Sequence, residues 1–281
     1  MVSLFLDIDA EVVSCLEGEE VLITLAAPLS VGARINVDIL VENENRNTLN
    51  VLVPLRAKND RVPKLMINEI RTEGDSVTNA AKAKVEFVEF IALTSGNLGA
   101  LQFYCAGNSI TKPVYEFPPA EIKAGEFIVL HLRTPSPDCI DETGDNLALS
   151  GGNEALPSAR DFWVPGSSKL IHKDDVLYLM DQDEKIIDAV LLSTSTGSVW
   201  SKTALNDAAQ LAARQGVWFP RGGKDNVPGT YFLAPSDAIY STGTTATRTI
   251  CRETEFCGSP EYWYITATSC ATPGTVNNPK R

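Results

Sequence analysis

The feature that most constrains the fold is the alternation of apolar and polar residues in short runs. In residues 33–56, apolar side chains occupy nearly every second position on both sides of the polar segment 42–47. A period of two is what a half-buried strand requires, and asparagine favours turns. The sequence therefore predicts a β-hairpin over residues 33–56.

Apolar runs of strand length recur along the rest of the chain, separated by glycine, proline, asparagine and serine. Further strands are predicted at residues 21–25, 65–70, 86–93, 101–106, 127–132, 176–180 and 186–192. Residues 203–216 have helical spacing instead, with Thr203 as the expected cap and Gly216 as the stop signal. Many short strands with one helix predict an all-β sandwich or barrel.

The polar segment 59–63 predicts a domain boundary. Residues 1–62 are expected to form a small, hairpin-rich β segment, which suits a partial immunoglobulin-like domain and is marginally stable alone. Residues 65–278 are expected to form the main domain.

Charge restricts the partners. The chain has 24 lysine and arginine residues against 36 aspartate and glutamate residues, a net charge of −12. This charge repels a phosphate backbone, and the basic residues are scattered, so nucleic acid is not an expected partner. No apolar stretch approaches the ~20 residues of a membrane-spanning helix. A cation or a basic partner suits the charge better.

The six cysteines permit disulfides, because their number is even. Their spacing does not determine a connectivity, and buried free thiols are the alternative. The disulfide candidates are Cys105, Cys139, Cys251, Cys257 and Cys270. A zinc site is disfavoured, because no C-x-x-C pair occurs.

The first residues lack the basic start and unbroken apolar run of a secretory signal, so no signal segment is expected in this chain. Val13-Ser14-Cys15 faintly resembles the cleavage box of a lipoprotein. The acidic residues Asp7, Asp9 and Glu11 before it argue against that interpretation.

Two groups of segments carry a resemblance to a known family. In the first half they are 67–70 (INEI), 85–90 (VEFVEF), 98–103 and 122–129 (IKAGEFIV). In the second half they are 174–181 with 186–188, 248–252, 262–264 and 271–277 (ATPGTVN). In this order they resemble the lamin-tail domain family, in its bacterial secreted and surface branch, over about residues 65–278.

The resemblance implies an immunoglobulin-like β-sandwich acting as a non-catalytic structural, adhesion or ligand-binding module. It also implies a location outside the cytoplasm: secreted, periplasmic or at the cell envelope. Long insertions relative to that family, at about residues 134–170 and 193–247, are where a protein or carbohydrate partner is expected to bind.

Acidic clusters are the candidate metal sites, because calcium takes several oxygen ligands. One cluster comprises Asp174, Asp175, Asp181 and Asp183, and a second comprises Asp138, Asp141 and Asp145. The alternative for residues 181–185 is a hairpin turn, since aspartate favours turns. Calcium aside, no cofactor is predicted.

Aromatic residues around the second insertion are the candidate ligand-binding residues, because they can stack on sugars or anchor a protein. They are Trp200, Trp218, Phe219, Tyr231 and Tyr240. The alternative is that they pack in the core.

No catalytic constellation is recognised, so the chain is not expected to be an enzyme. It has two histidines, His131 and His172, and no G-x-S-x-G motif. Two alternative functions stay open: an accessory binding domain of a nuclease or phosphoesterase system, to which lamin-tail-like domains are often fused, and a calcium-dependent carbohydrate-binding module. The oligomeric state also stays open.

Overall fold

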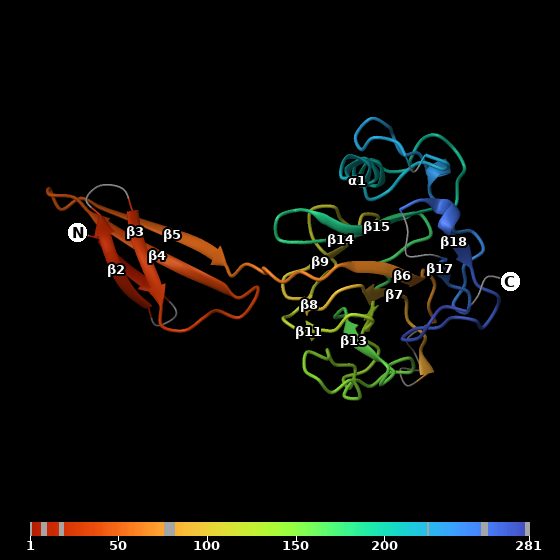
Figure 1. Ribbon diagram of the computed structural model, residues 1–281, viewed down its shortest axis with the longest axis horizontal. Helices are drawn as coiled ribbons and strands as arrows, with labels where there is room; N and C mark the ends of the chain where they lie inside the picture. Colours follow the sequence, from red (N-terminus) through yellow and green to blue (C-terminus); the bar gives the residue numbers. More distant parts are fainter. Residues whose placement is uncertain are drawn as a thin grey trace. The chain divides into compact units, whose positions relative to one another are not determined.

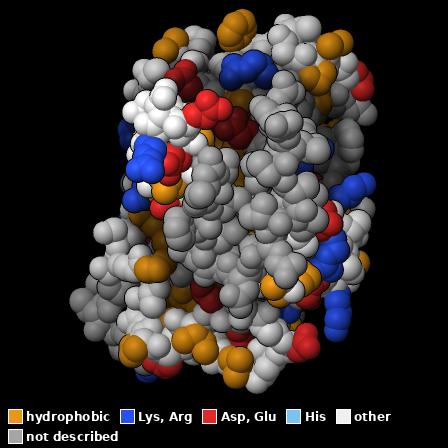
Figure 2. All heavy atoms as spheres, turned by 90° about the vertical axis from the view of Figure 1, so that its left-hand side faces the viewer, with side chains coloured by type: hydrophobic (Ala, Val, Ile, Leu, Met, Phe, Trp, Pro, Cys, Tyr) orange, Lys and Arg blue, Asp and Glu red, His pale blue; other side chains and the backbone are white. Residues whose placement is uncertain are grey.

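The computed structural model describes residues 2–6, 10–16, 20–75, 82–223, 225–253 and 258–278, with side chains from residue 24 onward (Figure 1). The chain divides into two compact units, Met1–Asp60 and Arg61–Arg281. On the face drawn in Figure 2, the acidic and basic side chains that are described lie interspersed.

The first unit consists of β-strands. A three-stranded sheet has the order β1 (Val2–Leu6), β4 (Arg34–Glu42), β5 (Thr48–Arg56), and β2 (Ala10–Leu16) pairs with β3 (Glu20–Leu25). The antiparallel pairing of β4 with β5 confirms the predicted hairpin.

Strand β5 is an edge strand of this sheet among the described residues. Hydrogen bonds from Asn43 N–H to Asn47 O and from Ala57 N–H to Ala33 O show that odd-numbered residues bond across the hairpin. The backbone groups of even-numbered residues in β5 therefore face away from β4. Pro54 is one of these residues and has no N–H, so it interrupts the row of donors at the edge.

The second unit contains two larger sheets and one smaller one. The six-stranded sheet has the order β13 (Ala159–Trp163), β12 (Phe127–His131), β7 (Phe87–Ala92), β6 (Leu65–Arg71), β17 (Ile250–Arg252), β18 (Trp263–Ile265). The five-stranded sheet has the order β10 (Tyr115–Glu116), β9 (Gln102–Cys105), β14 (Asp175–Met180), β15 (Ile186–Ser193), β16 (Ile239–Tyr240). Strands β8 (Gly96–Asn97) and β11 (Glu121–Ile122) form a pair.

The described residues are thus mostly β, with several sheets and a single α-helix, α1 (Thr203–Arg214), as predicted. Short 3₁₀ turns cover Pro235–Asp237 and Pro260–Tyr262. Within the described ranges, no helix is long and apolar enough to cross a membrane.

Both larger sheets contribute to one hydrophobic core. Phe90 of the six-stranded sheet meets Phe103 of the five-stranded sheet edge to face, with ring centroids 5.8 Å apart. Phe117 lies against both Phe90, at 6.0 Å, and Phe162, at 5.2 Å. These rings contribute packing beyond the area they bury.

A bulge in β6 determines which of its side chains enter this core. Ile67 pairs with Phe90 and the next register position is Glu69, so Asn68 is the extra residue. Ile67 and Ile70 consequently both lie in the core, whereas Glu69 and Arg71 lie on the outer face of the sheet. Asp188 accepts the N–H of Ile67 at 2.7 Å and so satisfies the backbone at the bulge.

Helix α1 packs on β14 and β15 and buries Leu205, Ala208 and Ala212 (Figure 1). The prediction that Thr203 is the cap is wrong, because the extended residue before the first turn is Lys202, which makes no side-chain cap bond. The stop at Gly216 is confirmed. Its φ of +67° is the left-handed conformation that ends a helix most readily at glycine.

The predicted insertions contain strands that were not predicted. Strand β13 pairs in parallel with β12, and β16 pairs in parallel with β15. A parallel pair needs a long crossover connection. Between β12 and β13 this connection includes the crossover loop, which we define as residues 134–158 and which has no helix or strand.

Candidate functional site

The outer face of the six-stranded sheet carries a row of buried polar side chains. The register brings Cys251 of β17, Glu69 of β6, Glu89 of β7 and Asp161 of β13 into one line, with Val129 of β12 between the last two. All of them are almost completely buried. The alternation of each strand places these side chains opposite the core.

The next row on this face is Arg71, Phe87, His131 and Trp163. The guanidinium of Arg71 lies 4.8 Å from the centre of the Phe87 ring. The His131 ring stacks on Trp163 with centroids 3.8 Å apart. His131 Nε2 lies 2.7 Å from a carboxylate oxygen of Asp161.

The closing segment, defined as residues 270–278, covers the two glutamates. Thr272 donates from its backbone N–H and its hydroxyl to Glu69, at 3.1 and 2.8 Å from Oε2. Gly274 donates its N–H to Glu89 at 2.6 Å. Burial, together with the charge of Glu69, raises the pKa of Glu89 well above its usual range, and burial also raises the pKa of Glu69.

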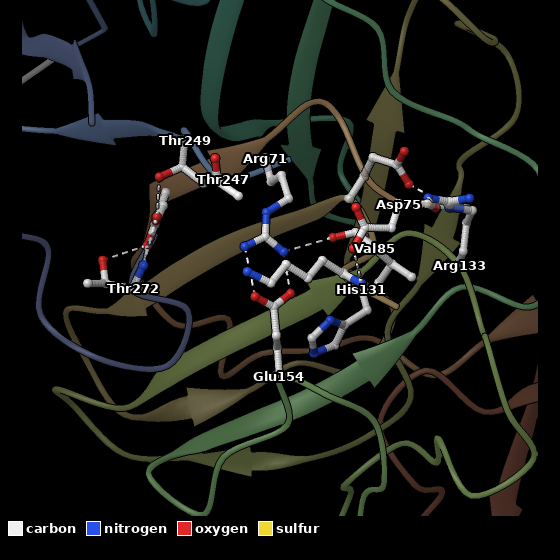
Figure 3. Close-up of polar contacts among 12 residues, drawn as sticks. Arg71, Asp75, Val85, His131, Arg133, Glu154, Thr247, Thr249 and Thr272 are labelled. Carbon is white, nitrogen blue, oxygen red and sulfur yellow. Dashed lines mark hydrogen bonds and ion pairs between the residues drawn. The ribbon is translucent and has the colours of Figure 1, made fainter. Parts of the chain in front are cut away.

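The crossover loop is fixed to the same face. Glu154 forms a two-pronged ion pair with Arg71, and Figure 3 shows the two side chains pointing toward each other. Glu142, which is buried, accepts the N–H groups of Leu149 and Ser150 at 3.0 Å and that of Asp161 at 2.9 Å. A loop without secondary structure is thus held by its own carboxylates.

These contacts hold the closing segment and the crossover loop on the outer face of the sheet. The carboxylates of Glu69, Glu89, Asp161 and Glu154 all accept hydrogen bonds from other parts of the chain. None of them lines either of the two described pockets. A substrate would have to displace the closing segment or the crossover loop to reach them.

A groove lies where the crossover loop leaves the sheet. It has a volume of about 570 Å³ and is lined mainly by Pro135, Pro137, Ile140, Trp163 and Pro165, and we call it the proline groove. The side chain of Ile140 is 44% exposed.

The crossover loop, which contributes Asp141 to the lining of the proline groove, is acidic. The crossover loop holds five acidic residues and neither lysine nor arginine; the five are Asp138, Asp141, Glu142, Asp145 and Glu154. Asp138, Asp141 and Asp145 are exposed. An apolar groove with an acidic rim favours a partner that combines apolar and basic side chains.

The acidic residues predicted as metal ligands in this loop have separate partners. Asp138 accepts a hydrogen bond from the hydroxyl of Ser136 at 2.7 Å. Asp141 accepts one from the backbone N–H of Trp163 at 2.8 Å and one from the hydroxyl of Tyr115. In the described parts of the chain, no group of three or more histidine, cysteine or acidic side chains could hold a metal ion. Calcium binding stays a prediction.

The other acidic cluster is divided between two ends of the β14–β15 hairpin. Asp174 accepts bonds from Thr194 and Ser193, which lower its pKa although burial opposes them. Asp175 is buried, and burial raises its pKa to about 7 although three backbone N–H groups donate to it. Asp181 accepts the N–H groups of Asp183 and Lys185 at 2.9 and 3.0 Å within the turn.

The predicted aromatic residues lie mostly inside the second unit. Trp200 and Trp218 are buried and donate their indole N–H groups to Leu233 O and Asp237 O, at 2.9 and 2.8 Å. The structure brings Phe219 and Tyr231 together, with ring centroids 5.9 Å apart, and Tyr231 donates to Trp218 O. Tyr240 is 53% exposed on β16.

The cysteines of the second unit that are described have free thiols. Cys105, Cys139 and Cys251 are buried, and Cys270 is half-buried. Cys257 lies outside the described residues. Disulfide pairing stays a prediction.

Two features of this face were not predicted from the sequence: the buried pair Glu69 and Glu89, and the proline groove. Glu69 and Glu89 carried a signal, since each is an acidic residue inside a mainly apolar strand. The proline groove also carried one, because Pro135, Pro137 and Pro165 flank β12 and β13 in the chain. Neither signal identifies the neighbours across the sheet.

Comparisons with known proteins found a family model and a relative that each match part of this chain. The model of a family named TP_1001_2nd, described as a protein second domain, matches residues 63–265. An uncharacterized protein of Treponema pallidum (strain Nichols) is 28% identical over 179 residues, which cover 59% of this chain and 43% of that protein. The match thus spans less than half the length of this relative.

Among solved structures, a DUF4876 family protein from Bacteroides thetaiotaomicron is similar over 89% of this chain and 83% of its own. The identity is 11% and the TM-score is 0.29. A score of this size supports no statement about the fold.

Proposed function

The chain belongs to the TP_1001_2nd family of protein second domains, and from this membership we propose that residues 61–281 are a non-catalytic module that binds a partner protein in the proline groove. A second domain is by its description one part of a larger protein. Function is nevertheless argued from the site, since one fold hosts many functions.

The proposal includes an immunoglobulin-like sandwich of the lamin-tail type. Two sheets that share one core are compatible with it. The closing segment is also compatible with this type of sandwich. Its ATPGTVN sequence resembles the signature of the lamin-tail family, and it lies over the outer face of β6 and β7.

One observation carries the binding proposal: the buried charges of the second unit have partners within the chain, whereas Pro137, Ile140 and Pro165 of the proline groove are exposed to solvent. Like Arg71 with Glu154, Arg133 pairs with Glu86 at 2.6 Å and Arg160 pairs with Glu126 at 2.7 Å, so each buried arginine has a glutamate of the same unit as its partner. An open apolar groove is a usual anchor site for a protein side chain.

Charge complementarity defines the partner as a cationic segment with apolar anchors. The acidic rim attracts lysine and arginine and raises the rate of encounter, and the groove takes the apolar side chain. The affinity for such a partner is expected to fall with added salt, because exposed charges are screened over roughly 10 Å at 0.1 M.

A peptide selection with the full chain tests this function. We expect peptides selected from a random library to combine lysine or arginine with leucine, isoleucine or phenylalanine. Fluorescence polarisation should then show about tenfold weaker binding to Ile140→Lys, which places a cation in the groove. The matched control is Leu149→Lys, since Leu149 is exposed on the same loop outside the groove lining.

Two results would overturn the function. One is selected peptides that bind Ile140→Lys as well as the unchanged protein. The other is a hydrolytic activity of the pure protein that one point substitution abolishes.

The proposed location is outside the cytoplasm. It is supported by the lamin-tail resemblance and the even number of cysteines. Fractionation of cells that produce the full-length protein tests it, and recovery only with cytoplasmic markers would contradict it.

A further inference from the structure

A smaller pocket lies beside β18, away from the residues of the proline groove. It has a volume of about 220 Å³, and its polar lining comes from Arg248, Tyr264, Thr266, Cys270 and Asn278. One molecule of liquid water occupies about 30 Å³, so the pocket has room for roughly seven waters or one small organic molecule. Ile265 and Ala267 supply its apolar wall.

Arg248 is held in place by contacts that leave most of its donors unused. Its backbone bridges to Thr245 in both directions, at 3.1 and 3.2 Å. Its Nε donates to Thr266 O at 2.9 Å. A guanidinium has five N–H donors in a rigid fork, so the terminal nitrogens stay available to a ligand.

Arg248 differs in this respect from the buried arginines of the second unit. Each of those has a carboxylate partner: Arg71 has Glu154, Arg133 has Glu86, Arg160 has Glu126 and Arg252 has Asp188. Within the described residues, no carboxylate lies within ion-pair distance of Arg248. The chain has twelve excess negative charges, so acidic residues are plentiful, yet none of those described forms an ion pair with Arg248.

The other polar groups of the pocket are fixed and uncharged. Tyr264 donates its hydroxyl to Asn278 O, and Asn278 donates its amide to Cys270 O at 3.1 Å. Burial raises the pKa of Tyr264, so the hydroxyl is neutral at neutral pH. Thr266 Oγ1 accepts the Thr249 N–H at 2.9 Å. Arg248 is therefore the charged group of the described lining, while the carboxylates of Glu69 and Glu253 act on Tyr264 from outside the pocket.

We propose that this pocket binds a small organic carboxylate, with the Arg248 guanidinium as its two-pronged partner and Ile265 and Ala267 against its short aliphatic part. A planar carboxylate matches the fork of an arginine, which makes such pairs shorter and stronger than neutral hydrogen bonds. The volume restricts the ligand to a few carbon atoms. Inorganic phosphate offers the same oxyanion chemistry without the apolar part.

The experiment is a titration of the full chain with propionate, followed by amide and arginine Nε–H signals in NMR spectra at constant ionic strength. Saturable shifts are expected at Arg248, Tyr264, Thr266 and Cys270. Arg248→Gln should weaken the binding about tenfold or more, as expected for a lost charge-assisted pair. Ala267→Phe should weaken it by filling the pocket while the bond from Arg248 Nε to Thr266 O stays in place.

The matched control is Arg221→Gln, which removes the same charge from an exposed arginine outside the pocket and should leave propionate binding unchanged. The proposal is overturned if propionate gives no saturable shift, or if Arg221→Gln weakens binding as much as Arg248→Gln. Equal or tighter binding of phosphate would also overturn it, because the apolar wall would then contribute nothing. If Arg248→Gln does not fold, Ala267→Phe decides.

Discussion

Glu69 on β6 and Glu89 on β7 stand directly opposite each other on the outer face of the six-stranded sheet, and both are almost completely buried. Two like charges in such positions repel each other. The closing segment compensates, because its N–H groups at Thr272 and Gly274 donate to one carboxylate each. The glutamate pair and the closing segment therefore stabilise each other.

Gly274→Ala is expected to destabilise the protein by about 2–3 kcal/mol. Gly274 has a φ of +77°, and an added Cβ would lie 3.0 Å from that of Ala159. Urea unfolding followed by tryptophan fluorescence measures the change. The control is Gly222→Ala, where φ is +69° but the Cβ would meet nothing within 4 Å. Equal losses in the two variants would show that the contact with the sheet contributes nothing.

Glu154→Gln is expected to cost about 3–5 kcal/mol, because it leaves the buried Arg71 without its carboxylate. The crossover loop should also open more often. Thermolysin cleavage at Leu147, Leu149 or Leu156 measures this opening, whereas trypsin would not, since the loop has no lysine or arginine. Asp145→Asn, an exposed change in the same loop, should alter neither quantity.

Asp175 is expected to make the protein less stable as the pH rises. The folded pKa of Asp175 is about 7 and lies above its usual value, so its contribution to stability is complete at low pH and is lost as the pH passes through 7. Between about pH 5 and pH 8 the loss is on the order of 2 kcal/mol. Asp175→Asn should remove this part of the pH dependence of unfolding in urea.

Asp183→Asn is the control for Asp175, because Asp183 is exposed in the turn of the same hairpin. Its pH profile should follow that of the unchanged protein. An unchanged profile in Asp175→Asn would show that burial does not control the titration of this carboxyl group.

The His131–Asp161 contact is expected to show a coupling of about 1–3 kcal/mol in a double-mutant cycle. His131→Phe keeps a ring on Trp163 but leaves Asp161 without its nearest donor. Asp161→Asn changes the acceptor, and the double variant should lose less than the sum of the two. Additive losses would mean that the stacking on Trp163 is the larger interaction at His131.

Pro54→Thr is expected to promote self-association through β5. The substitution supplies an N–H at a position that faces away from β4, next to the exposed Leu52 and Leu55. Sedimentation at increasing concentration measures the mass. Pro54→Lys restores the same N–H with a charge and should associate less; equal association of both variants would exclude pairing at this edge.

Local pattern was enough to predict the main strands and the end of the helix. Period two identified β4 and β5, apolar runs of strand length identified β14 and β15, and Gly216 stops α1 because glycine adopts a positive φ without strain. These features depend on residues that are close in sequence, which is why they can be read from the chain alone.

The outer face could not be predicted in this way. The bulge at Asn68 changes which side of the sheet each later residue of β6 occupies, and alternation alone would place Ile67 and Glu69 on one face. Strand β13 lies in the segment 134–170 that was expected to be an insertion relative to the lamin-tail family, and two of its five residues, Arg160 and Asp161, are charged. Arg160 and Asp161 are tolerated there because Glu126 and His131, from distant positions, meet them.

The pairing of β6 with β17 also has a consequence for synthesis on the ribosome. Ile70 finds its partner only when Ile250 has been made, although β7 reaches the other side of β6 much earlier. At about 5–20 residues per second, this interval of 180 residues lasts roughly 10 to 40 seconds. During that time the edge of β6 that pairs with β17 has no strand beside it, and Thr272, which donates to Glu69, has not been made.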